Sequence, residues 1–175
     1  MGNRTEFATV PPVRVDKKAL LETLRSTVKR DLEVATRAAK ATKEAATHEE
    51  AKPENDKDTR AIEASYLAGA QGERVRELER TLAVLDLLPT KDLPEDAPVG
   101  SGAVVRIRAA KGREELVCLF ALAGGGLKAE SNGVSVQVVT PKSPLGQALL
   151  GARVGDDIEV ELGRVIKGYE VVEVG

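Results

Sequence analysis

The feature that most constrains this chain is a pair of helix-forming runs in its first half, separated by a single break. From Lys17 to Thr47 there is no proline or glycine, and apolar or small side chains recur mostly three and four residues apart. The run from Ala61 to Leu85 repeats this spacing without interruption. Such spacing places one apolar stripe along a helix, close to a heptad seam. The sequence therefore predicts two long helices that each bury one face.

The break between the two runs, His48–Asp58, contains Pro53 and Asn55, and both residues favour turns. Two helices of similar length joined by a short turn fold back on each other as an antiparallel pair. We predict a coiled-coil hairpin about 45 Å long, at ~1.5 Å per residue. Its tip lies at residues 47–58.

The predicted seam changes in side-chain size along the hairpin. Leucine and valine at the base, within Leu21–Val28, face Val75–Leu85, whereas small residues of Ala35–Ala46 face Ala61–Ala68. Small side chains bury little area, at ~25 cal/mol per Å². Glycines such as Gly69 weaken the second helix further, by ~1 kcal/mol relative to alanine. We expect the tip half to be slim and to be the less stable half.

The second half of the chain has a different character. A segment rich in proline and acidic residues, Thr90–Gly100, is typical of a linker. Beyond it, β-rich runs predict strands at 103–109, 116–123, 134–139, 158–162 and 169–174. One short helix is predicted at Pro144–Leu150, with Ser143 as its cap. We expect the leucines of this helix to fill the core: Leu145, Leu149 and Leu150.

The predicted fold class is α + β, an N-terminal long antiparallel coiled-coil hairpin followed by a compact, mostly antiparallel α+β domain. The predicted boundaries are an extended or disordered lead-in at 1–15, the hairpin at 16–89, the linker at 90–99 and the domain at 100–175.

The composition argues against several classes of function. Aromatic residues make up 2% of the chain, too few to wall a pocket that stacks bases or holds an apolar ligand. A formal net charge of -2 does not indicate free DNA as a partner. With one cysteine, Cys118, and one histidine, His48, neither an internal disulfide nor a zinc site is expected. Cys118 is predicted to be a buried strand thiol. His48 is predicted to be a solvated turn residue, with contact to a nucleotide phosphate or RNA as the alternative.

Membrane insertion is not predicted either. No apolar stretch approaches ~20 residues, the length of a spanning helix. The segment Met1–Val15 also lacks the apolar core of a signal peptide. We expect a cytoplasmic protein.

Three C-terminal segments together resemble the end of the GreA/GreB bacterial transcript-cleavage factors. They are Thr140-Pro-Lys-Ser-Pro-Leu-Gly-Gln-Ala-Leu-Leu-Gly151, Val154-Gly-Asp-Asp-Ile-Glu-Val160 and Gly168-Tyr-Glu-Val-Val-Glu-Val174. Their order matches the family pattern of Ser-Pro, a short helix ending in Leu-x-Gly, Gly-Asp with a strand, and a final Tyr-Glu strand. With the preceding hairpin, the resemblance covers nearly the whole chain after residue 15.

The resemblance implies a role beside RNA polymerase. In this family the hairpin enters the secondary channel of the polymerase, and the C-terminal domain, FKBP-like in fold, docks on the channel rim. Acidic tip residues help the polymerase to hold its second Mg²⁺ and a water, so that the polymerase cleaves its own backtracked RNA. The chemistry is reasonable, because Mg²⁺ prefers hard oxygen ligands and two-metal phosphoryl chemistry needs a second cation near the first.

Several expectations about partners follow from the same resemblance. The protein would not itself be an enzyme and would have no cofactor of its own, since Mg²⁺ is held jointly with the polymerase. It would contact the nascent RNA 3′ end only indirectly, and DNA only through the complex. We expect a monomer, associated with the nucleoid through the polymerase.

The tip carries the candidate acidic residues. Cleavage-stimulating members resemble Asp-x-x-Glu-Asn at this turn, and Glu54-Asn55 matches the last two positions. Ala51 stands where the first acid is expected, and Glu50 is a candidate substitute. The resemblance implies Glu54, Glu50 and Asp56 as the assisting acids, with Glu54 and Glu50 as ligands of the shared Mg²⁺. It also implies Asn55 as a partner-binding residue. The alternative is that these charges form an ordinary solvated hairpin end.

Two further surfaces on the hairpin are candidates for partner contacts. Arg30 and Arg37 lie seven apart on one helix face, where the family holds RNA through phosphates. The alternative is an ordinary ion-paired helix surface. Ile62 and Tyr66, four apart and off the alanine seam, would form an apolar patch against the polymerase or would cover the thin hairpin.

In the C-terminal domain, Ser143-Pro144 corresponds to the family loop that contacts a polymerase coiled coil. Some members carry an acid just before Ser-Pro, whereas this chain carries Lys142.

Other functions remain to be weighed against cleavage stimulation. A non-cleaving regulator of the same family would occupy the channel and inhibit or modulate transcription, and Ala51 favours it. A prolyl isomerase is disfavoured, because residues 97–175 offer only Phe120 and Tyr169 as aromatic walls. A coiled-coil adaptor that binds no polymerase is the third possibility.

Overall fold

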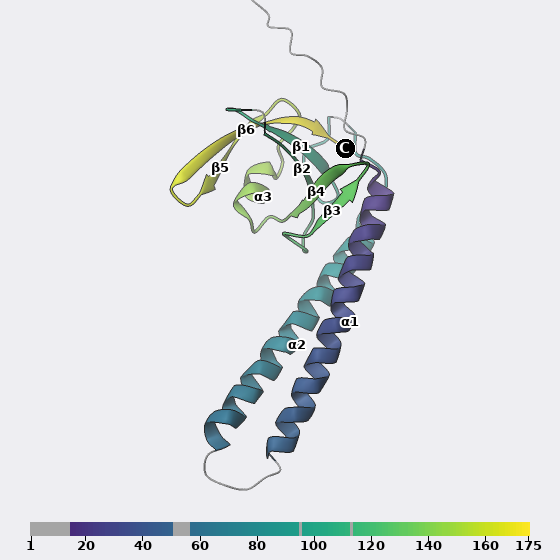
Figure 1. Ribbon diagram of the computed structural model, residues 1–175. Helices are drawn as coiled ribbons and strands as arrows, with labels where there is room; N and C mark the ends of the chain where they lie inside the picture. Colours follow the sequence, from purple (N-terminus) through teal and green to yellow (C-terminus); the bar gives the residue numbers. More distant parts are fainter. Residues whose placement is uncertain (1–14, 51–56, 95, 113) are drawn as a thin grey trace, which may run out of the picture.

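The computed structural model (Figure 1) describes residues 15–50, 57–94, 96–112 and 114–175, with only the backbone described for 46, 48–50, 57–61 and 64. Two long helices are followed by a sheet with one short helix, which confirms the predicted α + β class. The elements in order are α1 (Lys17–Glu50), α2 (Lys57–Leu87), β1 (Val104–Ala109), β2 (Glu115–Phe120), β3 (Lys128–Ser131), β4 (Val134–Val139), α3 (Pro144–Leu149), β5 (Asp157–Leu162) and β6 (Val165–Val174).

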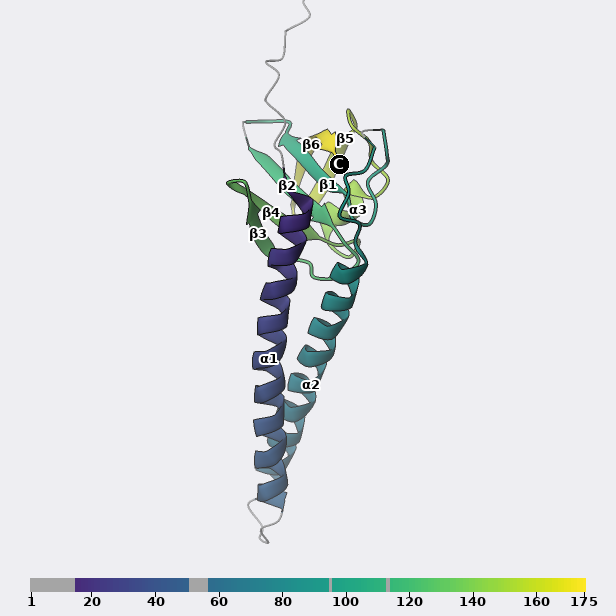
Figure 2. The same cartoon turned by 90° about the vertical axis from the view of Figure 1, so that its right-hand side faces the viewer.

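The two long helices lie side by side and antiparallel in both views (Figures 1 and 2). Helix α1 begins with Asp16 as its cap, because the Ala19 amide donates to Asp16 Oδ1 at 2.9 Å. The leucines at its base are fully buried, with Leu21 at 0% and Leu24 at 1% exposure. Both helices extend into the range predicted for the tip, since α1 continues to Glu50 and α2 begins at Lys57. No proline or glycine lies between Lys17 and Pro53 to stop α1 earlier.

The sheet has the strand order β3-β4-β2-β1-β6-β5. All neighbouring strands are antiparallel except β2 and β4, which are parallel. Strand β3 was not predicted, because its sequence, Lys-Ala-Glu-Ser, contains no β-branched or aromatic residue. Its antiparallel pairing with β4 identifies it as a strand, and it forms one edge of the sheet.

The two faces of the sheet bury two separate apolar clusters. One cluster joins the base of the hairpin to strands β2, β3 and β4, and includes Leu24, Leu85, Leu119 and Val136. The other lies on the opposite face under α3 and includes Phe120 of β2 together with side chains of β1, β5 and β6. Because the first cluster is continuous from the hairpin to the sheet, the hairpin base and the sheet form one packed unit.

Polar contacts also fix the hairpin base. The Asp16 amide donates to Ser131 Oγ on β3 at 2.9 Å, and Lys17 Nζ donates to the Lys91 carbonyl at 2.9 Å. Burial lowers the pKa of Lys17, and the Asp92 carboxylate opposes that shift. Between the two helices, Arg25 Nη2 donates to the Leu85 carbonyl at 2.7 Å. These bonds lie next to the apolar base cluster and satisfy polar groups that the packing would otherwise leave unpaired.

The prediction for the leucines of α3 is only partly correct. Leu149 is completely buried and Leu145 is half-buried against the same cluster, as expected. Leu150, in contrast, is 56% exposed, so its assignment to the core was wrong. Helix α3 ends at Leu149, and the backbone leaves the helical path at Leu150, where φ is -59° and ψ is 118°.

Two glycine substitutions test this packing in opposite directions. A Cβ added at Gly146 would lie 1.9 Å from the Thr140 carbonyl oxygen, whereas one added at Gly69 meets nothing within 4 Å. We expect Gly146→Ala to lower the free energy of unfolding by about 3 kcal/mol. Gly69→Ala should raise it by about 1 kcal/mol through helix propensity. Urea titration of both variants measures the difference, and wild-type stability of Gly146→Ala would contradict the described loop.

Candidate functional site

The tip of the hairpin lies at the end of the molecule remote from the sheet. Glu50 is the last residue of α1 and Lys57 the first of α2, and both helix ends lie far from the strands (Figure 1). Of the predicted tip residues, Glu50 is described only in its backbone. The residues Ala51, Glu54, Asn55 and Asp56 lie outside the described residues. The assignment of Glu50, Glu54 and Asp56 as assisting acids therefore stays a prediction. So do the roles of Glu50 and Glu54 as Mg²⁺ ligands and of Asn55 as a partner contact.

The predicted basic face on α1 is present as exposed side chains. Arg30 and Arg37 are both exposed. Among the described residues 29–44 of α1, the one ion pair joins Lys40 Nζ to Glu44 Oε1 at 3.9 Å. Neither guanidinium is engaged by a described carboxylate, so both are available to a partner.

The apolar pair on α2 points into solvent. Ile62 is 68% and Tyr66 81% exposed, so these side chains do not cover the hairpin seam. Leu67, which the sequence analysis did not single out, is also 51% exposed, and it lies about 100° around the helix from Tyr66. Its position next to Tyr66 in the chain was visible, but only the packing of α1 against α2 shows that it faces outward.

Ser143 and Pro144 begin α3. The Ser143 Oγ accepts from the Gly146 amide at 3.1 Å and donates to the Thr140 carbonyl at 3.0 Å, while Pro144 occupies the first helical turn. Ser143 is therefore the cap that the sequence predicted. Pro144 and Lys142 are exposed on the same loop.

A leucine lies close to this loop that the sequence analysis missed. Leu122, 61% exposed, follows β2. The Ala121 amide donates to the Val139 carbonyl at 2.9 Å, so the segments after β2 and after β4 run together. Because β2 and β4 are parallel, their carboxyl ends lie at the same end of the sheet, so Leu122 lies beside the start of the segment that leads from β4 to the Ser-Pro loop. The sequence analysis placed Leu122 inside a strand predicted at 116–123, so its exposed position was not predicted.

Two buried titratable groups of the sheet domain have structural roles. Arg106, 7% exposed on β1, lies with its Nη2 2.9 Å from Glu173 Oε2, so a carboxylate compensates its buried charge. Cys118 is 2% exposed, which confirms the predicted buried thiol. Burial raises the pKa of Cys118 to about 12, so the thiol is protonated and unreactive near neutral pH.

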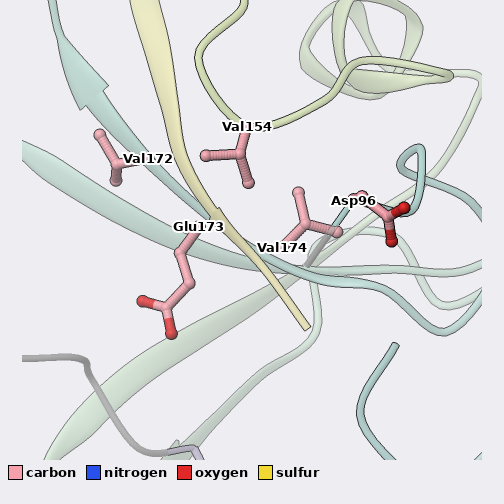
Figure 3. A pocket seen from close by; sticks show the side chains of 5 residues that line it. All are labelled: Asp96, Val154, Val172, Glu173 and Val174. Atoms are coloured by element: carbon pink, nitrogen blue, oxygen red, sulfur yellow. The ribbon is translucent and has the colours of Figure 1, made fainter. Parts of the chain in front are cut away.

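One shallow hollow lies beside β6 (Figure 3). Val154 and Val174 point into it and Asp96 lies at its side, while the Glu173 carboxylate points away from Asp96. Its lining contains no aromatic residue, which is unlike the apolar pocket that a prolyl isomerase needs. Within the described ranges there is no cluster of three or more histidine, cysteine or acidic residues that could hold a metal ion. No helix in that part of the chain is both long and apolar enough to span a membrane.

Comparison with known proteins places this arrangement in a family. A family model described as "Transcription elongation factor, GreA/GreB, C-term" matches residues 95–175. Transcription elongation factor GreA of Syntrophus aciditrophicus (strain SB) is 32% identical over 125 residues, which cover 69% of each chain. GreA of Clostridium botulinum (strain Okra / Type B1) is 29% identical over 101 residues, and the chain spans 59% of that relative's length. Thermus aquaticus Gfh1, whose crystal structure is known, is 21% identical in sequence to this chain. The structural match covers 90% of this chain and 94% of Gfh1, with a TM-score of 0.36.

The fold and these matches define the class of protein in which a long helical hairpin is mounted on a small sheet domain. The chain belongs to the GreA/GreB family of transcription elongation factors.

The cap at the start of α3 can be tested directly. Ser143→Ala removes the bond to the Gly146 amide and should lower the free energy of unfolding by about 1 kcal/mol. Lys142→Ala, one residue earlier on the exposed part of the loop, should change it by less than ~0.5 kcal/mol. Thermal or urea unfolding of both variants measures the difference, and equal effects would show that Ser143 does not cap the helix.

Proposed function

We propose that this protein inserts its hairpin into the secondary channel of RNA polymerase and uses acidic tip residues to promote cleavage of backtracked RNA. The single observation that carries the proposal is the continuous apolar cluster between the hairpin base and the sheet. A rod fixed at its base can deliver its tip to a site far from the domain that anchors it. Family membership supplies transcription elongation as the process.

The dimensions of the hairpin suit insertion into a narrow channel. Helix α1 has 34 residues, which corresponds to about 50 Å at ~1.5 Å per residue. Toward the tip, the seam contains small side chains, such as Ala35 at 8% exposure and the half-buried Ala39. Small seam residues keep the two helices close together, so the inserted half is slender.

The tip acids supply the chemistry in this proposal. Carboxylates are hard oxygen ligands of the kind that Mg²⁺ prefers, and Glu54 and Glu50 would hold the ion jointly with the polymerase. Asp56 lies next to the matching Glu54-Asn55 pair and is the third acid. The bound ion would stabilise the charge that develops as the phosphodiester bond is hydrolysed. The protein is then an accessory to the polymerase's own endonuclease activity and not an enzyme itself.

Two other surfaces would hold the protein in place. On α1, the exposed Arg30 and Arg37 would attract the phosphates of the extruded RNA 3′ end. At the sheet domain, Ser143 and Pro144, with Leu122 beside them, would contact the rim of the channel. Lys142 gives this loop a positive charge, so an acidic group on the polymerase is the matching contact.

The proposed role also implies an oligomeric state and a location in the cell. It would act as a monomer in the cytoplasm, at the nucleoid through the polymerase, and would meet DNA only within that complex.

A non-cleaving regulator is the second candidate, and Ala51 favours it. The first acid of the family's tip pattern is replaced there by a side chain that cannot bind a cation. Such a protein would occupy the same channel and slow transcription without shortening the RNA.

Backtracked elongation complexes distinguish the two candidates. With purified protein added, we expect the RNA to shorten, as followed on a denaturing gel. Glu54→Ala should slow that shortening by ~10- to 100-fold, because a metal ligand is lost. Glu44→Ala, an exposed acid on α1 with 63% side-chain exposure, is the matched control and should leave the rate unchanged.

Each other outcome of this experiment has a clear meaning. Slower elongation without shortening supports the non-cleaving regulator. Absence of binding to RNA polymerase rejects both candidates and leaves a coiled-coil adaptor.

A further inference from the structure

A two-residue turn joins β3 to β4 at the edge of the sheet. Ser131 and Val134 pair across the ends of the two strands, and Asn132 and Gly133 form the turn between them. Asn132 has φ 51° and Gly133 has φ 78°. Positive φ at both positions is typical of the type I′ hairpin turn, for which Asn-Gly is a preferred pair.

The Asn-Gly pair also carries a reactivity of its own. The nitrogen of the residue after an asparagine can attack the side-chain amide carbon and close a ring, and glycine has no Cβ to hinder that approach. Asparagine is for this reason a thermolabile residue. The chain has three asparagines, and the other two, Asn3 and Asn55, precede arginine and aspartate. Asn132 therefore belongs to the one Asn-Gly pair in the chain.

The surroundings of the turn leave room for ring closure. Asn132 and Gly133 are both exposed, and a Cβ added at Gly133 would meet nothing within 4 Å. The backbone at Asn132 must still rotate before the nitrogen reaches the side chain, so the turn has to open for part of the time. Strand β3 has four residues and lies at the edge of the sheet. Such short edge elements open locally at a low cost in free energy.

We infer that Asn132 is a site of spontaneous deamidation through a succinimide, and that its isoaspartate product loosens the attachment of α1 to the sheet. The inference does not depend on the proposed function, because the reaction needs only this chain and water. Turn geometry alone does not account for the asparagine, since Gly-Gly and Asp-Gly form the same turn.

The reaction consumes one water and releases one ammonia. As the bond from the Gly133 nitrogen to Asn132 Cγ forms, that nitrogen loses its proton to solvent, and the bond from Cγ to Nδ2 breaks to release ammonia. Water then opens the succinimide at either of its two carbonyl groups. Cleavage of the new bond gives aspartate, whereas cleavage of the original peptide bond gives isoaspartate, in which the main chain runs through Cγ.

The isoaspartate product acts on a contact that holds the start of α1. It adds one atom to the main chain of a turn that fixes the register, so it displaces Ser131 relative to Val134. Ser131 Oγ accepts from the Asp16 amide at 2.9 Å and donates to the Asp16 carbonyl at 3.4 Å. Strand β3 lies beside the first turns of α1 in both views (Figures 1 and 2). A shift of Ser131 therefore weakens the polar contact at the hairpin base.

The test ages the full-length protein at mildly alkaline pH and compares it with Asn132→Gly. Gly-Gly also forms a type I′ turn, so this variant keeps the hairpin and lacks the reacting amide. Isoaspartate O-methyltransferase labels the product, and mass spectrometry locates it as a gain of about 1 Da in the tryptic peptide 129–142. Hydrogen exchange measures how readily the first turns of α1 open.

In aged wild type we expect isoaspartate in excess over aspartate at position 132, and at least about tenfold less label in the same peptide of Asn132→Gly. Amides at the start of α1 should exchange about fivefold faster in the modified protein, and at an unchanged rate in aged Asn132→Gly. Freshly purified Asn132→Asp adds the charge without the extra backbone atom and should exchange within about twofold of fresh wild type.

Three results would overturn the inference. Peptide 129–142 without label, or with aspartate as its sole product, would reject the succinimide site. Label with an unchanged exchange rate in α1 would reject the effect on the hairpin base. Fast exchange in fresh Asn132→Asp would show that charge, and not the lengthened backbone, loosens α1.

Discussion

The apolar contact between the hairpin base and one face of the sheet is the interaction on which the rest of this structure depends. Leu24 and Leu85 from the two helices and Leu119 and Val136 from the sheet belong to the same buried cluster. Without it, the hairpin would be a pair of helices on a loose tether. With it, the direction of the rod relative to the domain is fixed, and a contact made by the domain positions the tip about 50 Å away.

The depth of burial changes along the hairpin with side-chain size. Burial is deep at the base, where Leu21 and Leu24 lie in the seam, and shallow toward the tip, where alanines meet. The apolar area buried per residue is smaller there, so local opening should cost less free energy than at the base. A slender and less stable end is acceptable for an element that gains its remaining contacts from a partner.

The candidate surfaces differed in how far the sequence could predict them. Helical spacing was enough to place Ile62 and Tyr66 off the seam, and the Ser-Pro pair was enough to place a cap at Ser143. Leu122 was missed, because its proximity to the Ser-Pro loop comes from the parallel pairing of β2 with β4. Leu150 was misassigned to the core, because periodicity does not reveal that the helix ends one residue earlier.

The sequence by itself determined the hairpin, the fold class and the family resemblance, because helical periodicity and short motifs are local properties of the chain. The tertiary structure decided what lies against the sheet. It showed that one face packs on the hairpin and the other on α3, and that Lys128–Ser131 is a strand. Those features depend on pairing between segments far apart in the chain, and strand propensity alone is too weak to show them.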